Sequence, residues 1–260
     1  MLERDGVRSK AEDGIARLEL HRPDCLNAMN RQLLRQLLAA LEWAAADEAV
    51  RAVIITGHGQ VFSAGADIRY LNRASAAEVR ELARLAVAVT GRIETLGKPV
   101  LAAINGDALG GGLEIAEACM LRLAAPHARF GHPEVRIGAV AGFGGTTRLP
   151  RLIGKGRAAE MLLTGRLIDA EEACRLGLVN RVAPADDLLA EAESLLREIM
   201  AQSPTAVRLS WEAIHRGLSL SEDESARLGA DYFGLAAQSE DFRIGTRAFL
   251  DKRPPKFKGR

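Results

Sequence analysis

Two short apolar runs, separated by a long helical pattern, restrict most strongly what this 260-residue chain can fold into. Residues 53–56 and Val100–Ile104 are both followed by glycine-containing turns, which is typical of buried strands. A helix is predicted between them, over residues 76–96. Two strands joined by a long helix need a crossover connection, which predicts parallel pairing and an α/β core.

Further elements are predicted on both sides of this core. Residues 15–20 alternate apolar and polar side chains and are expected to form a strand, and a helix is predicted over Arg31–Ala46. Another strand is expected at residues 120–125. From Arg157 onward Ala, Leu, Glu and Arg recur at helical spacing, which predicts a helical tail.

The helical tail contains the predicted domain boundary. Asp169 supplies a start signal for one helix, and Ser203-Pro204 supplies an N-cap and a first helical residue for another. We therefore predict a core over residues 1–200 and a helical region over residues 201–260. This second region is expected to pack on the core or on another subunit.

Charge and composition limit the classes of partner. The 35 Lys and Arg residues nearly balance the 34 Asp and Glu residues, so no strong positive field predicts binding to nucleic acid or to an anionic membrane. The apolar runs are shorter than the roughly 18 residues of a membrane span. Residues 1–10 lack the apolar stretch of a signal peptide, and the three widely spaced cysteines suit a reducing compartment. These features predict a cytoplasmic protein.

Glycines follow two of the predicted strands and could present main-chain N–H groups to a ligand. They lie within residues 57–67 and 105–114. Three of them, Gly110 to Gly112, immediately precede a predicted helix, whose N-terminus adds unpaired donors and the positive end of its dipole. This pattern predicts a site for an anion or an oxyanion. The alternative is that the glycines only allow tight strand-to-helix packing.

Two glutamates near these glycines are candidate acid–base residues. Glu114 lies one turn into the predicted helix between apolar neighbours, which favours an inward position, with surface exposure as the alternative. Glu134 follows a proline that fixes the backbone before it. The adjacent His132 is interpreted as a structural residue. The sequence has no nucleophile elbow and no metal-ligand spacing, so neither a catalytic triad nor a metal site is predicted.

Several of these features follow one another in a recognisable order. They are Phe62-Ser63-Ala64-Gly65-Ala66-Asp67-Ile68, then Lys98-Pro99-Val100, then Asn105-Gly106 leading to Ala108-Leu109-Gly110-Gly111-Gly112 and Glu114, and last Phe130-Gly131 with Pro133-Glu134. This order resembles the enoyl-CoA hydratase/isomerase family, whose members are also called crotonases. The resemblance covers nearly the whole chain.

The resemblance implies a fold and an oxyanion hole. The expected fold is an α/β spiral of repeated β-β-α units, followed by a helical C-terminal region that forms trimers, which usually pair as hexamers. The main-chain N–H groups of Ala66 and Gly111 are expected to bind the carbonyl oxygen of a thioester. Two fixed donors would stabilise the enolate that forms there more than the neutral substrate.

The resemblance also implies the reaction. Family members that hydrate carry both glutamates, so the chain is expected to add water across the 2,3 double bond of a 2-enoyl-CoA in fatty acid breakdown. Glu114 would deprotonate the water that attacks Cβ, and Glu134 would deliver a proton to Cα. The alternative within the family is a double-bond isomerase or a pathway-specific hydratase. A non-catalytic acyl-CoA-binding relative is disfavoured by the intact pair, and an RNA-binding relative by the net charge of +1.

Substrate contacts are expected from the same comparison. Coenzyme A is part of the substrate, and no separate cofactor and no metal are expected. The predicted binding residues are Ala64, Ala66, Asp67, Ile68, Arg69, Gly111, Phe249 and Lys252. The last two are expected to reach the ligand of a neighbouring subunit, with a solvated tail as the alternative for Lys252. Ala141 stands where relatives often have a proline, which leaves the acyl-chain preference open.

Overall fold

The computed structural model describes residues 6–260 and divides into two compact units. The first comprises the described residues through Leu96 together with Val100–Glu193. The second comprises Gly97–Pro99 and Ser194–Arg260. The division falls between Glu193 and Ser194, within helix α8 (Leu188–Met200), a few residues before the predicted boundary at residue 200.

A six-stranded sheet forms the centre of the first unit, with the order β1-β2-β3-β5-β7-β10. Its strands are β1 (Gly6–Glu12), β2 (Ile15–His21), β3 (Ala52–Gly57), β5 (Val100–Ile104), β7 (Leu121–Ala124) and β10 (Arg181–Val182). β1 and β2 form an antiparallel hairpin, and every other pairing in the sheet is parallel. All residues of β3 and β5 are buried, as expected of parallel strands that are covered on both faces. The predicted parallel pairing of these two strands is confirmed.

A second, four-stranded sheet has the order β4-β6-β8-β9. It consists of β4 (Val61–Ser63), β6 (Asp107–Leu109), β8 (Arg129–Gly131) and β9 (Ile168–Asp169). The pairs β3/β4, β5/β6 and β7/β8 each give one strand to each sheet before the chain enters helical structure. This repetition is the spiral of β-β-α units that was predicted, and the α/β fold class is confirmed.

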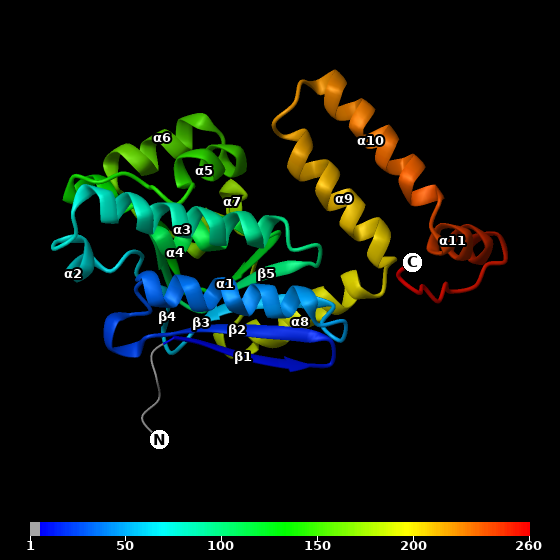
Figure 1. Ribbon diagram of the computed structural model, residues 1–260, viewed down its shortest axis with the longest axis horizontal. Helices are drawn as coiled ribbons and strands as arrows, with labels where there is room; N and C mark the ends of the chain where they lie inside the picture. Colours follow the sequence, from blue (N-terminus) through cyan, green and yellow to red (C-terminus); the bar gives the residue numbers. More distant parts are fainter. Residues whose placement is uncertain (1–5) are drawn as a thin grey trace. The chain divides into compact units, whose positions relative to one another are not determined.

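Helices cover the sheets and form their connections. They are α1 (Arg31–Ala46), α2 (Ile68–Leu71), α3 (Ala76–Glu94), α4 (Gly111–Ala118), α5 (Gly145–Ile153), α6 (Lys155–Thr164) and α7 (Ala170–Leu176). α1 and α3 pack side by side, as Figure 1 shows. α4 differs from the others because all eight of its residues are buried. Any polar side chain on α4 therefore lies inside the unit.

The second unit contains α9 (Pro204–Gly217), α10 (Glu222–Ala237) and α11 (Glu240–Leu250). α9 packs along α10, as seen in Figure 1. Asp241 is 1% exposed and accepts hydrogen bonds from the Ser203 hydroxyl and from the main-chain N–H groups of Lys258 and Gly259, which ties the end of the chain to this unit. Several large apolar side chains remain exposed here: Ile214, Leu218, Leu220, Phe233, Leu235, Phe249 and Leu250.

The prediction that the chain is only helical after Arg157 is wrong in one respect. β9 and β10 lie in that region and extend one sheet each. Both strands are two residues long, which is too short to produce an alternating pattern, and only the neighbouring strands stabilise them. No helix within residues 6–260 is long and apolar enough to cross a membrane.

Candidate active site

Ala66 follows β4 in a loop that the main chain holds at two points. The N–H of Met29 donates to the oxygen of Gly65 at 2.7 Å, and the N–H of Asp67 donates to the oxygen of Met29 at 2.9 Å. The two bonds engage the residues before and after Ala66, through the oxygen of Gly65 and the N–H of Asp67. The N–H of Ala66 itself therefore points away from Met29. β4 pairs in parallel with β6, so this loop lies beside the glycines that follow β6.

The N–H of Gly111 lies close to that of Ala66. A Cβ atom placed on Gly111 would be 3.5 Å from the Ala66 nitrogen, and one placed on Gly65 would be 3.3 Å from the Gly111 nitrogen. Neither N–H donates to any residue between 6 and 260. Gly111 is also the first residue of α4, where the helix dipole is positive. The structure therefore brings together the two donors of the predicted oxyanion hole.

The neighbouring glycines are required by close packing. Gly110 has a φ of 47°, and a Cβ there would lie 2.8 Å from Oε1 of Glu134. A Cβ on Gly112 would lie 2.5 Å from the Ser63 oxygen. The sequence offered tight strand-to-helix packing as the alternative to a ligand site. The structure has both this packing and the free N–H donors.

Glu114 is directed into the unit and not to the surface. It is 1% exposed, and its Oε1 accepts hydrogen bonds from the N–H groups of Phe143 and Gly145, both at 2.7 Å. Burial raises the pKa of Glu114 to about 7, although the Gly145 N–H and the charge of His132 oppose this shift. A carboxyl group with such a pKa can exchange a proton near neutral pH.

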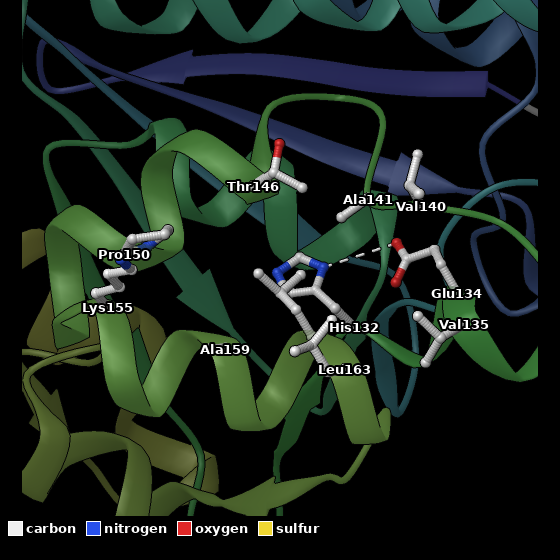
Figure 2. Close-up of a pocket in the computed structure, with 11 residues that line it drawn as sticks. His132, Glu134, Val135, Val140, Ala141, Thr146, Pro150, Lys155, Ala159 and Leu163 are labelled. Atoms are coloured by element: carbon white, nitrogen blue, oxygen red, sulfur yellow. Dashed lines mark ion pairs between the residues drawn. The ribbon is translucent and has the colours of Figure 1, made fainter.

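Glu134 lies beside His132 at the beginning of a 3-10 turn, Pro133–Ile137. Its Oε1 is 3.7 Å from Nδ1 of His132, and the other ring nitrogen of His132, Nε2, is 2.9 Å from Oε1 of Glu117. The side chains of His132 and Glu117 are 0% exposed. Figure 2 shows the imidazole ring directed toward the Glu134 carboxylate.

His132 carries a strongly shifted pKa. Burial alone would lower the pKa of His132, but the charge and hydrogen bond of Glu117, together with Glu134, raise it to about 10. The sequence pattern predicted a structural role for His132 and did not single out Glu117. One signal for Glu117 was available, because it stands three residues after Glu114, on the same face of a helix.

A cavity of about 280 Å³ opens beside His132 and Glu134. Aliphatic side chains of α6 and of the segment after Glu134 also line it, and Figure 2 shows Val135 and Val140 close to Glu134. Among them are Val135, Val140, Leu162 and Leu163. Ala141, the position where relatives often have a proline, also lines this cavity. The cavity has the apolar character of a site for a short hydrocarbon chain.

The predicted substrate segment from Ala64 to Arg69 continues from the donor loop. Asp67 caps α2 and pairs with Arg22 at 3.1 Å, and although burial opposes it, Arg22 lowers the pKa of Asp67. Its carboxylate therefore holds the loop. Ile68 is 53% exposed and Arg69 is also exposed, so both are accessible to a ligand.

Phe249 and Lys252 belong to the second unit. Phe249 is 83% exposed near the end of α11, and Lys252 follows the helix with a φ of 53°. The candidate site described above lies in the first unit, which includes neither residue. Their contact with the ligand of a neighbouring subunit stays a prediction. Within residues 6–260, no group of three or more His, Cys, Asp or Glu side chains is arranged to hold a metal ion.

The β-β-α spiral with two free main-chain donors beside two carboxyl groups defines a class of acyl-thioester proteins. This chain belongs to the enoyl-CoA hydratase/isomerase family, whose family model matches residues 10–260. It is 44% identical to the crotonyl-CoA hydratase of Syntrophomonas wolfei, over 97% of this chain and 98% of that protein. It is 40% identical to the short-chain-enoyl-CoA hydratase of Clostridium acetobutylicum, over 97% of each chain.

Solved structures agree with this assignment. An enoyl-CoA hydratase from Bacillus anthracis superimposes with a TM-score of 0.93 at 36% identity, covering 98% of this chain and 99% of that one. The resemblance seen in the order of the sequence motifs is confirmed.

Proposed function

We propose that this protein is an enoyl-CoA hydratase, a lyase that adds water to a 2-enoyl-CoA and forms a 3-hydroxyacyl-CoA. The observation that carries the proposal is the pair of unpaired N–H groups, at Ala66 and Gly111, beside two carboxyl groups at one site. The names of the relatives with which the chain aligns over nearly its full length also support it. The sequence further supports a cytoplasmic enzyme without a separate cofactor.

The proposed reaction uses each of these groups. The thioester oxygen accepts hydrogen bonds from the N–H groups of Ala66 and Gly111, which stabilise the enolate as it forms. Glu114 takes a proton from the water whose oxygen bonds to Cβ. Glu134 supplies the proton that bonds to Cα. One oxygen of Glu114 is already fixed by two main-chain N–H groups, so its orientation is set before the substrate binds.

The cavity beside Glu134 supports a short apolar acyl chain as the preferred substrate. Its volume of about 280 Å³ is at the small end for ligand pockets. The coenzyme A part would lie along residues 64–69. A double-bond isomerase of the same family is the second candidate, because it would use the same donors with a proton shuttle between two carbons.

We also propose that the protein assembles into trimers or pairs of trimers. The second unit leaves large apolar side chains exposed on α9, α10 and α11, among them Ile214, Phe233 and Phe249. Large apolar side chains left exposed in such number are typical of a protein interface. We propose that other copies of this chain cover these side chains, because the family resemblance implies trimers.

Hydration can be tested by following the absorbance of the conjugated enoyl thioester. Crotonyl-CoA should lose this absorbance and yield 3-hydroxybutyryl-CoA, and longer 2-enoyl-CoA substrates should react more slowly. A product with the double bond moved, or no reaction with any chain length, would contradict the proposal. The chain-length series measures the acyl preference in the same experiment.

A further inference from the structure

Three ionisable side chains form a row at the candidate site, and two of them are fully buried. Glu117 lies on α4, His132 follows β8, and Glu134 begins the next turn. The distances are 2.9 Å from Glu117 Oε1 to His132 Nε2, and 3.7 Å from His132 Nδ1 to Glu134 Oε1. Glu117 and His132 have no exposed side-chain surface, whereas Glu134 retains 16%. The row therefore runs from the interior of the unit to the residue at its open end.

Glu134 needs a partner to hold its carboxylate in one orientation. The last torsion of a glutamate side chain is broad, so an unpartnered carboxylate rotates easily. In residues 6–260, Oε2 of Glu134 is buried and has no hydrogen-bond partner. Oε1 lies between His132 and Gly110. A Cβ atom placed on Gly110 would be 2.8 Å from this oxygen. Nδ1 of His132 is 3.7 Å from Oε1 and also has no hydrogen-bond partner among these residues, so it is the polar group placed to orient this carboxyl group.

We propose that His132, held by the buried carboxylate of Glu117, is a positioning residue that orients Glu134 for proton transfer to the substrate. The inference rests on the proposed hydratase function. A neutral imidazole has one N–H donor, whereas an imidazolium has two. Only the charged ring can donate to Glu117 through Nε2 and also direct an N–H toward Oε1 of Glu134 through Nδ1, which leaves Oε2 of Glu134 to carry the proton that goes to Cα.

The surroundings of His132 favour the charged ring. The acidic side chains that face it are Glu114 and Glu117 on α4 and Glu134 in the next turn. The cationic groups near the site are Lys155, which lines the same cavity, Arg148 on α5, which is paired with Glu94, and buried Arg122 on β7, whose charge interacts with Glu117. The carboxylates outweigh the burial of the ring and keep the pKa of His132 at about 10.

Removal of the Glu117 charge tests this arrangement. In Glu117→Gln the His132 ring loses its anion and should lose its second proton within the working range, since an ordinary histidine titrates at about 6.5. With crotonyl-CoA we expect kcat to fall by about 10- to 100-fold, as for a misplaced reacting group, while KM changes by less than about 3-fold. The defect should grow between pH 6 and pH 8.

His132→Gln provides the comparison, because its defect should be similar in size and should not change over this pH range. Glu172→Gln is the matched control: it removes the charge of one of the two carboxylates that pair with Arg166, and it should leave kcat and its pH dependence as in the parent. If a single variant does not fold, the double variant Glu117→Gln/His132→Gln removes both members of the buried ion pair together and should fold, with Arg122 still held by three main-chain carbonyls. It should show the same loss of kcat as His132→Gln.

The outcomes separate this inference from the proposed function. A parent protein that hydrates no enoyl-CoA would overturn the hydratase proposal and the role of His132 with it. A parent protein that is active, with Glu117→Gln or the double variant equally active, would overturn only the positioning role. A Glu117→Gln defect that stays constant from pH 6 to pH 8 would also overturn it, because a purely structural change has no reason to follow the ionisation of His132.

Discussion

Glu114 and Glu134 are the residues on which the proposed chemistry depends. We expect Glu114→Gln and Glu134→Gln to slow hydration by about 10²–10⁴, the range for a positioned acid or base, with little change in fold or ligand affinity. An amide oxygen at position 114 can still accept from Phe143 and Gly145. Steady-state kinetics with crotonyl-CoA measures the effect. Near-parent turnover in either variant would remove that residue from the mechanism.

The raised pKa of Glu114 predicts how activity depends on pH. Burial raises the pKa of Glu114 to about 7, so the free protein loses this proton only as the pH rises through about 7. If Glu114 is the base, kcat/KM should increase over this interval. Glu114→Gln should lack the increase. A parent profile that is flat from pH 6 to pH 8 would argue against Glu114 as the base.

The raised pKa of Glu114 makes the stability of the fold decrease with pH, whereas activity is expected to increase. Because the pKa of Glu114 is higher in the folded protein than the usual 4.5, the protonated form favours folding. This contribution is fully present below about pH 4.5 and is lost as the pH rises through about 7. The ionised base therefore destabilises the fold under the conditions in which it is expected to act.

Ala66 tests the oxyanion hole through its main chain. Ala66→Pro deletes the N–H and fixes φ near −65°, so a folded variant should lose about 10²–10³ in kcat. Ala66→Gly is the control, because it keeps the N–H and should remain close to the parent. Ser63→Ala is a poor control, since the buried Ser63 hydroxyl donates to Asn27 and accepts from the Gly65 N–H. Parent-like kcat in a folded Ala66→Pro protein would place the hole elsewhere.

At the scale of elements, the contact between α4 and β4 sets the position of the donors. A methyl group on Gly112 would lie 2.5 Å from the Ser63 oxygen and would push the two elements apart. We expect Gly112→Ala to lower the free energy of unfolding by about 1–3 kcal/mol, as overpacking does. The measurement is chemical denaturation followed by circular dichroism.

Gly156 in α6 supplies the control for this substitution. A Cβ there meets no atom within 4 Å, so Gly156→Ala should be neutral or stabilising by up to about 1 kcal/mol through helix propensity. Equal stabilities of the Gly112→Ala and Gly156→Ala proteins would show that α4 can move away from β4 without cost.

The exposed apolar side chains of the second unit predict self-association of the protein. Light scattering should give three or six times the chain mass of 27.9 kDa. The physical reason is that Phe233, at 68% exposure, and Phe249, at 83%, would otherwise remain in water. A monodisperse monomer at micromolar concentration would contradict the proposed assembly, although it would leave the residues of the first unit unaffected.

Local patterns in the sequence were sufficient to predict much of the fold. The helix Arg31–Ala46 and the strand Val100–Ile104 have the predicted bounds, and Ser203 is the N-cap of α9 as expected. Periodicity and capping are properties of neighbouring residues, so they can be recognised without tertiary structure. The two-residue strands β9 and β10 carry no such pattern and could not be found in this way.

In the candidate site, too, the sequence predicted some features and only the tertiary structure determined others. The order of motifs was enough to select Ala66, Gly111, Glu114 and Glu134. The groups that control the glutamates come from other parts of the chain: Glu114 is held by N–H groups 29 and 31 residues away, and His132 pairs with a carboxylate 15 residues before it. Only the packing of α4 against those segments decides these contacts, because burial and charge pairing depend on distance in space and not on separation in sequence.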